Sequence, residues 1–290
     1  MKKYAGWICL CICLALASAT VWQGITSRSR AGERLQHLTL QLKSPLAKDS
    51  LRQMRELEQS QEQPADFCAW KEEQEQSVAA AETGIHVWAN LLWLNGDSQL
   101  LLPYGKNLCE EDLQGCLLDR DTAWELFGSQ NVEGMTLVIA GQSRVVRGVF
   151  STPKRLVILQ GAPAGVTGGW NRVTVQQKPG QSPQELGESF LIRHNLNGNL
   201  LRWDFLKGFS WLGELVPGKW SDFAGWSVNL EQKADELRQI SQVEKSSLEL
   251  EYWNLQMRGL GFMLFGVVTS WGVVLLLLKR LSNLVRCRGR

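Results

Sequence analysis

The sequence is poor in the residues that build metal centres and nucleophilic active sites. Its three histidines lie far apart, at His37, His86 and His194, and it contains no Cys-x-x-Cys, His-Glu-x-x-His or Gly-x-Ser-x-Gly. Zinc sites and Ser- or Cys-based catalysis need such groups at defined spacing. We therefore expect neither a metal ion nor a cofactor, and we expect that the protein is not an enzyme.

The sequence also lacks a nucleotide-binding P-loop. Its nearest approach, Pro217-Gly218-Lys219-Trp220, has Trp220 where the motif requires Ser or Thr. If the protein works with ATP, a partner must therefore bind the nucleotide.

No strong excess of one charge is present. The 31 Lys and Arg and the 29 Asp and Glu are interspersed and give a net charge of +2. Nucleic-acid binding requires a basic surface, so nucleic acid is not an expected partner. The acidic groups at 72–75 and 110–112 are typical of solvated faces or turns, and not of an acid–base pair in a pocket.

The cysteines do not form the pattern of a disulfide framework. Three lie in the N-terminal apolar run and one near the C-terminus, which leaves Cys68, Cys109 and Cys116 between them. A disulfide framework would need an even number. Cys109 and Cys116 could pair in an oxidising compartment, but we favour two separate, partly buried thiols.

Long apolar runs occur only at the two ends of the chain. The first, Ala5–Val21, follows two lysines, and the second, Leu260–Leu278, precedes a tail rich in Lys and Arg. As a helix, each run can cross a bilayer core of about 30 Å. Basic residues on both outer flanks predict two spans in the cell membrane, with cytoplasmic termini and an extracytoplasmic middle.

The first run has a second interpretation. A basic start, an apolar core and Ala17-Ser18-Ala19 also describe a secretory signal with a cleavage site. Cleavage would remove one anchor but would leave the middle of the chain on the same side of the membrane.

Amphipathic segments adjoin both apolar runs. Leu35, Leu38 and Leu42 recur at helical spacing, Ser44-Pro45 is typical of a helix start, and Leu230, Leu237 and Ile240 form a similar stripe before the second run. We interpret these segments as two stalk helices that pack on each other; the alternative is a pair of solvated linkers. The predicted organisation is a cytoplasmic tip 1–4, a span 5–22, a stalk 23–63, a core domain 64–228, a stalk 229–258, a span 259–279 and a cytoplasmic tail 280–290.

Between the stalks the pattern is one of strands mixed with short helices. The expected strands are 85–94, 99–102, 115–118, 135–139, 143–150, 156–160 and 172–177. Asp119 or Asp121 can cap a helix that ends at Gly128, and Ser182 opens a second helix with a capping box. These elements predict an α+β core domain.

Part of this core resembles a known family. The segments Leu-Cys-Glu-Glu-Asp-Leu-Gln-Gly-Cys-Leu-Leu-Asp (108–119), Thr-Ala-Trp-Glu-Leu-Phe-Gly (122–128), Asn-Val-Glu-Gly (131–134) and Arg-Val-Val-Arg-Gly-Val (144–149) resemble the MacB-like periplasmic core domain of FtsX/MacB-type ABC-transporter permeases. The residues that carry this motif are structural: Gly115, Cys116, Leu126, Phe127, Gly128, Gly134 and Gly148.

The resemblance implies an extracytoplasmic component of an ABC transport or mechanotransmission system. Permeases of this family have further spans after the second, whereas this sequence stops there, so we expect an ABC ATPase or a fuller permease to be supplied in trans. The alternative is a membrane-tethered receptor or scaffold that binds a ligand of the cell envelope. Its candidate surface is aromatic, and it comprises Trp203, Phe205, Phe209, Trp211 and Trp220, which could equally serve as core.

Overall fold

The computed structural model describes residues 15–27, 37–102, 105–152, 154–162, 169–178, 180–201, 223–242 and 245–288. By its internal contacts the chain divides into two compact units, one made of residues 34–251 and the other of residues 1–33 together with 252–290. The predicted cytoplasmic tip, 1–4, and the first ten residues of the predicted span 5–22 lie outside the described residues.

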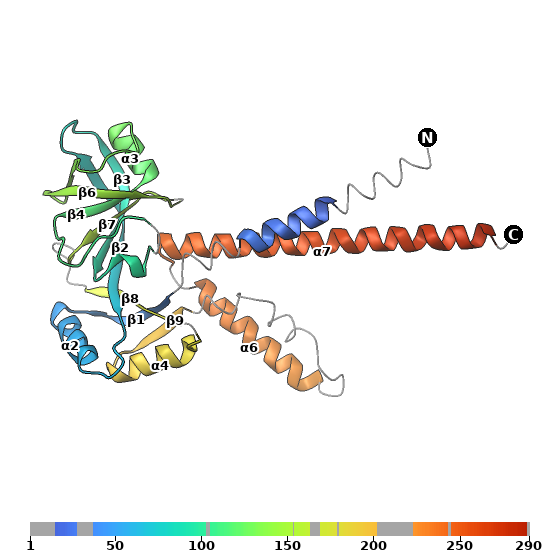
Figure 1. Ribbon diagram of the computed structural model, residues 1–290. Coiled ribbons are helices and arrows are strands. Elements are labelled where there is room, and N and C mark those ends of the chain that lie inside the picture. Colours follow the sequence, from blue (N-terminus) through green and yellow to red (C-terminus); the bar gives the residue numbers. More distant parts are fainter. Residues whose placement is uncertain are drawn as a thin grey trace. The chain divides into compact units, whose positions relative to one another are not determined.

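The larger unit is built on one nine-stranded, mostly antiparallel sheet with helices packed on it (Figure 1). Its elements are β1 (Leu38–Leu46), α2 (Lys48–Gln59), β2 (Phe67–Ala80), β3 (His86–Asn95), the 3₁₀ turn η1 (Ser98–Leu100), β4 (Gly115–Asp119), α3 (Arg120–Phe127), β5 (Thr136–Ile139), β6 (Gln142–Phe150), β7 (Leu156–Gln160), β8 (Trp170–Val175), α4 (Pro183–Arg193), β9 (Gly198–Leu201) and α6 (Phe223–Gln242). This mixture agrees with the predicted α+β class.

Six of the strands form a closed ring, which we call the barrel lobe. They follow the order β3-β7-β4-β6-β5-β2, and β2 pairs back onto β3. Of the two caps that the sequence allowed for α3, Asp119 and Asp121, the structure uses Asp119, whose carboxylate accepts hydrogen bonds from the Thr122 N–H. The helix ends at Gly128 with φ +66°. Ala123 and Leu126 of α3 belong to the same buried cluster as Leu91 and Val157.

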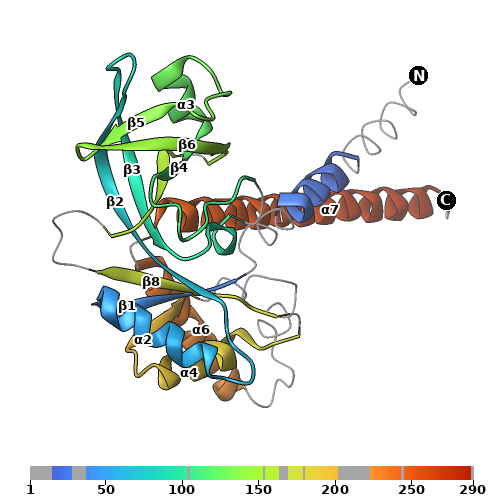
Figure 2. The ribbon, with the colours of Figure 1, turned by 60° about the vertical axis from the view of Figure 1, so that its left-hand side comes forward.

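The remaining strands form a second lobe, which we call the open-sheet lobe. The first residues of β2 pair with β8, which pairs with β1, which pairs with β9. Helices α2 and α4 bury Leu51, Met54 and Phe190 against this part of the sheet. Strand β2 is thus shared, and Figure 2 shows it running from one lobe to the other.

The helical interpretation of Leu38 and Leu42 is wrong. Both lie in β1 and share their sheet face with Leu40, so the pattern that matters is the two-residue period of a strand. Ser44-Pro45 does not start a helix either: α2 begins at Lys48, and its N-cap, Ala47, makes no side-chain capping bond. The expected strand at 99–102 is replaced by η1, because the Asp97 carboxylate accepts from the Gln99 N–H and turns the chain.

The predicted stalk 229–258 is not one helix. Helix α6 ends at Gln242, residues 245–246 are not helical, and α7 (Ser247–Arg288) begins after them. The first residues of α7 belong to the larger unit.

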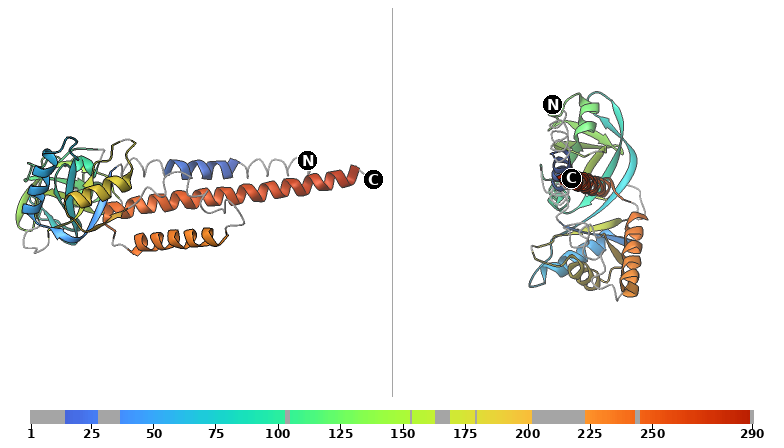
Figure 3. Two further views of the ribbon diagram at one scale, coloured as in Figure 1. Left: turned by 90° about the horizontal axis from the view of Figure 1, so that it is seen from below. Right: turned by 90° about the vertical axis from the view of Figure 1, so that its right-hand side faces the viewer.

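In the smaller unit, residues 15–27 are helical and lie against α7 (Figure 3). A Cβ atom added to Gly24 would lie 2.8 Å from the Gly259 carbonyl oxygen, and one added to Gly266 would lie 3.1 Å from that of Ala17. The first helix therefore meets α7 in antiparallel order. Among the described residues, no helix is both long and apolar enough to cross a membrane.

Candidate functional site: the anchor of α7 in the core domain

The first turn of α7 is a reciprocal capping box. The Ser246 hydroxyl accepts a hydrogen bond from the Glu249 N–H at 3.2 Å, and the Glu249 carboxylate accepts one from the Ser246 N–H at 2.7 Å. Each side chain satisfies a backbone donor that the helix start leaves without a partner. The start of α7 is therefore fixed locally, and both residues are buried.

Glu249 also ties this turn to the open-sheet lobe. The Arg172 Nε of β8 donates to the Glu249 Oε1 at 3.1 Å, with the side chains 6% and 1% exposed. The Arg172 guanidinium carbon lies 5.1 Å from the centroid of the Trp70 ring, so the cation also contacts an aromatic face. Burial raises the pKa of the Glu249 carboxyl, although Arg172 and Ser246 oppose that rise.

Ser247 ties the same turn to the barrel lobe. The Glu72 carboxylate on β2 accepts from the Ser247 N–H at 2.7 Å and from the Ser247 hydroxyl. The Asn90 amide on β3 donates to Ser247 Oγ at 2.9 Å and to Glu72 Oε1 at 2.8 Å. Leu248 completes the contact by packing in a buried apolar cluster with Leu92 and Ile158, among others.

We call this set of polar residues the α7 anchor: Glu72, Asn90, Arg172, Ser246, Ser247 and Glu249. It joins one helix start to three strands of both lobes. The arrangement suits it to mechanical connection, because the Arg172–Glu249 ion pair is buried and the half-buried Glu72 carboxylate is bound by Ser247 and Asn90.

A polar groove of about 670 Å³ lies between the lobes, where β2 begins and β3 ends, and Phe67 and Gly96 are among the residues that line it. Its lining includes Arg55 and Gln59 from α2, and Gly96 and Gln99 from the segment that follows β3. Arg55 crosses from one side to the other, since it forms an ion pair with Glu110 and donates to the Asn95 side chain at 2.6 Å.

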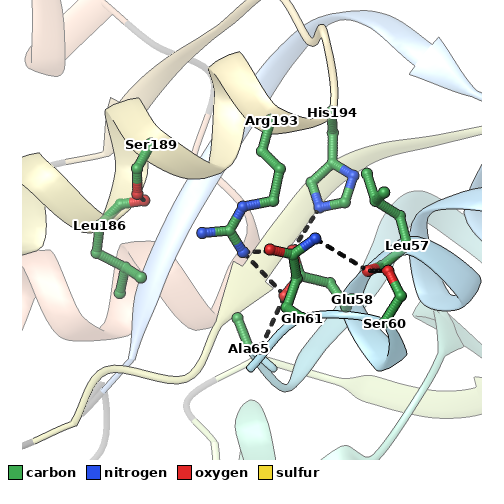
Figure 4. Close-up of polar contacts among 9 residues, drawn as sticks. All are labelled: Leu57, Glu58, Ser60, Gln61, Ala65, Leu186, Ser189, Arg193 and His194. Atoms are coloured by element: carbon green, nitrogen blue, oxygen red, sulfur yellow. Dashed lines mark hydrogen bonds and ion pairs between the residues drawn. The ribbon is translucent and has the colours of Figure 1, made fainter. Parts of the chain in front are cut away.

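A buried carboxylate forms part of the wall of this groove on the side of the open-sheet lobe. Glu58 accepts from the Ala65 N–H at 2.8 Å and from Arg193 at 2.8 Å, and its Oε1 lies 2.8 Å from His194 Nε2 (Figure 4). Burial alone would raise the pKa of Glu58, but these bonds hold it below its ordinary value, whereas burial lowers the pKa of His194. The cluster joins α2 to α4 and has the character of a structural element.

The structure gives the residues of the sequence motif structural roles. Gly115 and Cys116 lie in β4, where a Cβ on Gly115 would come within 2.4 Å of the Asp112 carboxylate. Gly134 has φ +85°, and a Cβ on Gly148 would come within 2.5 Å of the Lys106 side chain. The other members of the motif lie at the C-terminal end of α3: Leu126 is buried, Phe127 packs on the same cluster, and Gly128 ends the helix.

The cysteines of the core are free thiols, so the disulfide alternative for Cys109 and Cys116 is not formed. Cys109 is exposed, whereas Cys116 is buried, and burial raises the pKa of its thiol to about 12. The aromatic surface predicted from Trp203, Phe205, Phe209, Trp211 and Trp220 lies outside the described residues. Within the part of the chain that is described, no group of three or more His, Cys, Asp or Glu could hold a metal ion.

The α7 anchor was not predicted from the sequence. Glu72, Glu73 and Glu75 were interpreted as part of a solvated face or turn. All three lie in β2, where Glu75 is exposed, but Glu72 binds Ser247 and Glu73 accepts from the Trp93 indole at 2.9 Å. One local signal was present: Ser246-Ser247-Leu248-Glu249 has the spacing of a capping box just before an apolar segment.

No protein-family model matches this chain, and no curated protein matches it. Among solved structures, the chain is similar to the periplasmic region of MacB from Actinobacillus actinomycetemcomitans, with 16% identity and a TM-score of 0.46 over 63% of this chain and 94% of that one. It is also similar to the extracellular domain of the noncanonic ABC-type transporter YknZ from Gram-positive bacteria, with 12% identity and a TM-score of 0.42 over 57% and 97%.

A third similar structure is a domain of a permease protein from Porphyromonas gingivalis, with 16% identity and a TM-score of 0.38 over 59% of this chain and 90% of that one. One of the three, the periplasmic region of MacB, carries the name that the sequence resemblance also gives.

Proposed function

We propose that this chain is a membrane-anchored extracytoplasmic component of a MacB-like ABC transport or mechanotransmission system, without an ATPase of its own. In this proposal the runs 5–22 and 259–279 span the cell membrane, both termini are cytoplasmic, and the core domain lies outside. An ABC ATPase or a fuller permease is supplied in trans.

The observation that carries this proposal is the α7 anchor. Helix α7 is continuous from Ser247 to Arg288 and contains the uncharged run 260–278, while its first turn binds strands of both lobes. A helix that is fixed at one end in a sheet and embedded at the other in a bilayer can transmit displacement, because helices move as rigid elements between discrete arrangements.

The contact between residues 15–27 and α7 supports the two-span topology. Gly24 lies against Gly259 and Ala17 against Gly266, so the first helix runs antiparallel to α7. Close approach at small residues is typical of helix pairs in membranes. Antiparallel spans bring both termini to the same side, as the basic flanks predict.

Affinity purification tests the proposed partners. A full-length chain with an affinity tag is expressed in its native host, the membranes are crosslinked, and the recovered proteins are identified by mass spectrometry. Recovery of an ABC ATPase subunit or a permease with further spans is expected. Recovery of neither from crosslinked membranes would contradict the proposal.

The groove supports a second candidate function, a membrane-tethered scaffold that binds a ligand of the cell envelope. It has the size of a small-molecule or peptide site, and polar groups of both lobes line it. The same purification distinguishes the two functions, because a scaffold would co-purify with an envelope ligand and with neither an ATPase nor a permease.

A further inference from the structure

Strand β2 contains an irregularity beside the α7 anchor. Glu73 pairs with Leu91 and Gln76 with Ala89, so Gln74 and Glu75 together face Asn90, which is the arrangement of a β-bulge. Glu75 has φ +50°, in the left-handed region that a residue with a side chain seldom adopts. Its backbone is held there by a specific bond: the Glu75 N–H donates to the Asn90 side-chain oxygen at 3.1 Å.

The bulge lies where β2 passes from one lobe to the other. On its edge away from β3, β2 pairs with β8 of the open-sheet lobe up to Trp70 and with β5 of the barrel lobe from Val78 onward. Between Trp70 and Val78, the pairing of β2 among the described residues is with β3 alone. A segment with backbone hydrogen bonds to a neighbouring strand on one edge only bends more easily than the parts of β2 that are paired on both edges.

One side chain connects this segment to α7. The oxygen of the Asn90 amide binds the bulge, and its nitrogen donates to Glu72 and to the Ser247 hydroxyl. The amide therefore uses its acceptor on the bulge and both of its donors on the anchor. A displacement of Ser247 acts on Asn90, and through Asn90 on the backbone of Glu75.

We propose that Asn90 couples the first turn of α7 to a hinge at the β2 bulge, so that displacement of α7 changes the separation of the two lobes across the groove. This inference rests on the proposed function of α7 as the element that moves. Asn90 acts as a positioning residue, and the moving parts are the lobes that carry Gln59 and Gln99 on either side of the groove.

Electron paramagnetic resonance distance measurement tests the coupling in the full chain in lipid nanodiscs. Spin labels are attached at Gln59→Cys and Gln99→Cys, both exposed positions of the groove lining. Cys109, Cys287 and the three cysteines of the first apolar run are replaced by Ala, while the buried Cys68 and Cys116 remain. The parent protein is expected to give one narrow distance distribution.

Asn90→Ala is expected to broaden this distribution and to shift its mean, and Glu249→Gln, which weakens the hold on α7, is expected to do the same. The matched control is Asn199→Ala, which changes an exposed asparagine of β9 remote from the bulge. If Asn90→Ala fails to fold, Asn90→Asp takes its place, because it keeps the acceptor for Glu75 and removes both donors to the anchor.

The inference is overturned if the Asn90 variants give the distribution of the parent protein. Broadening by Glu249→Gln alone would show that α7 acts on the lobes by a route other than Asn90, and the proposed function would then stand without this hinge. The partners recovered from crosslinked membranes test the proposed function separately, so failure of one is distinguishable from failure of the other.

Discussion

Arg172 and Glu249 form an ion pair of 3.1 Å that joins β8 to the first turn of α7, and both side chains are almost fully withdrawn from solvent. Removing two charges from water costs free energy that their mutual attraction offsets only in part, so such a pair contributes less to stability than to specificity. The raised pKa of Glu249 has the same origin, because burial disfavours the charged carboxylate. We therefore interpret the α7 anchor as a specific connection between the helix and the sheet.

The first prediction concerns this pair. Arg172→Met or Glu249→Leu alone should lower the free energy of unfolding by about 3–5 kcal/mol, because each leaves a buried charge without its partner. The double variant Arg172→Met/Glu249→Leu should recover most of that loss. Denaturant unfolding of the purified full chain, followed by tryptophan fluorescence, measures the three values.

The matched control is the exposed ion pair between Arg155 and Glu125. Arg155→Gln should change the free energy of unfolding by less than about 1 kcal/mol, since exposed pairs contribute little. If the Arg172 and Glu249 single variants lose no more free energy of unfolding than this control, the pair does not hold α7.

The second prediction is a loss of stability in acid that depends on Glu58 and His194. Both groups have a lowered pKa in the folded protein, against ordinary values of 4.5 and 6.5. Each group therefore contributes stability that is fully present above its ordinary pKa. That stability is lost as the pH falls through the pKa of the group in the folded protein. Stability should decline below about pH 6.5 from His194, and again below about pH 4.5 from Glu58.

The variants Glu58→Gln and His194→Gln separate the two steps. Glu58→Gln should be less stable than the parent protein at pH 7 and should show a flatter decline below pH 4.5. Free energies of unfolding measured between pH 3 and pH 8 check this. A decline that is unchanged in both variants would assign the acid sensitivity to other groups.

The third prediction concerns the contact of the first helix with α7. A Cβ atom at Gly266 would meet Val21 and Thr20, so Gly266→Leu should separate the two helices. A Cβ atom at Gly272 on the same helix meets nothing within 4 Å, so Gly272→Leu is the control. Thr20 Oγ1 lies 2.9 Å from the Cβ position of residue 266, so Thr20→Cys/Gly266→Cys should form a disulfide. Non-reducing electrophoresis after protease cleavage between the helices detects it. The absence of that disulfide under oxidising conditions would contradict the contact.

Local signals in the sequence were sufficient to predict the helices and strands at the centre of the barrel lobe. Gly128 was predicted as the end of α3 and its cap was narrowed to Asp119 or Asp121, because a helix cap and a left-handed terminus depend on residues close in the chain. The capping serine of α4, Ser182, was identified for the same reason: it accepts from the Glu185 N–H at 3.5 Å. The two strands on either side of residue 140 and the strands near 158 and 173 were also located correctly.

The parts that the sequence did not predict depend on distant partners. Strand β2 has a run of charged and amide side chains from Lys71 to Gln76, so it shows no alternation, and its strand state comes from pairing with β3 and β8. Glu72 and Ser247 are 175 positions apart, and Arg172 and Glu249 are 77 apart. Neither contact produces a periodic pattern in the sequence, so the α7 anchor can be recognised only in the folded structure.

The most direct test is to find on which side of the membrane the core domain and the C-terminal tail lie. Cys109 is exposed on the core domain, and Cys287 lies in the C-terminal tail. Each is kept as the single accessible thiol by replacing the other with Ser, and whole cells are treated with a thiol reagent that does not cross the cell membrane. We predict that Cys109 is labelled in cells whose membrane is intact, and that Cys287 is labelled only after the membrane is permeabilised. Labelling of both thiols in intact cells, or of neither before permeabilisation, would place the core domain and the tail on one side and contradict the proposal that α7 carries movement from the membrane to the core domain.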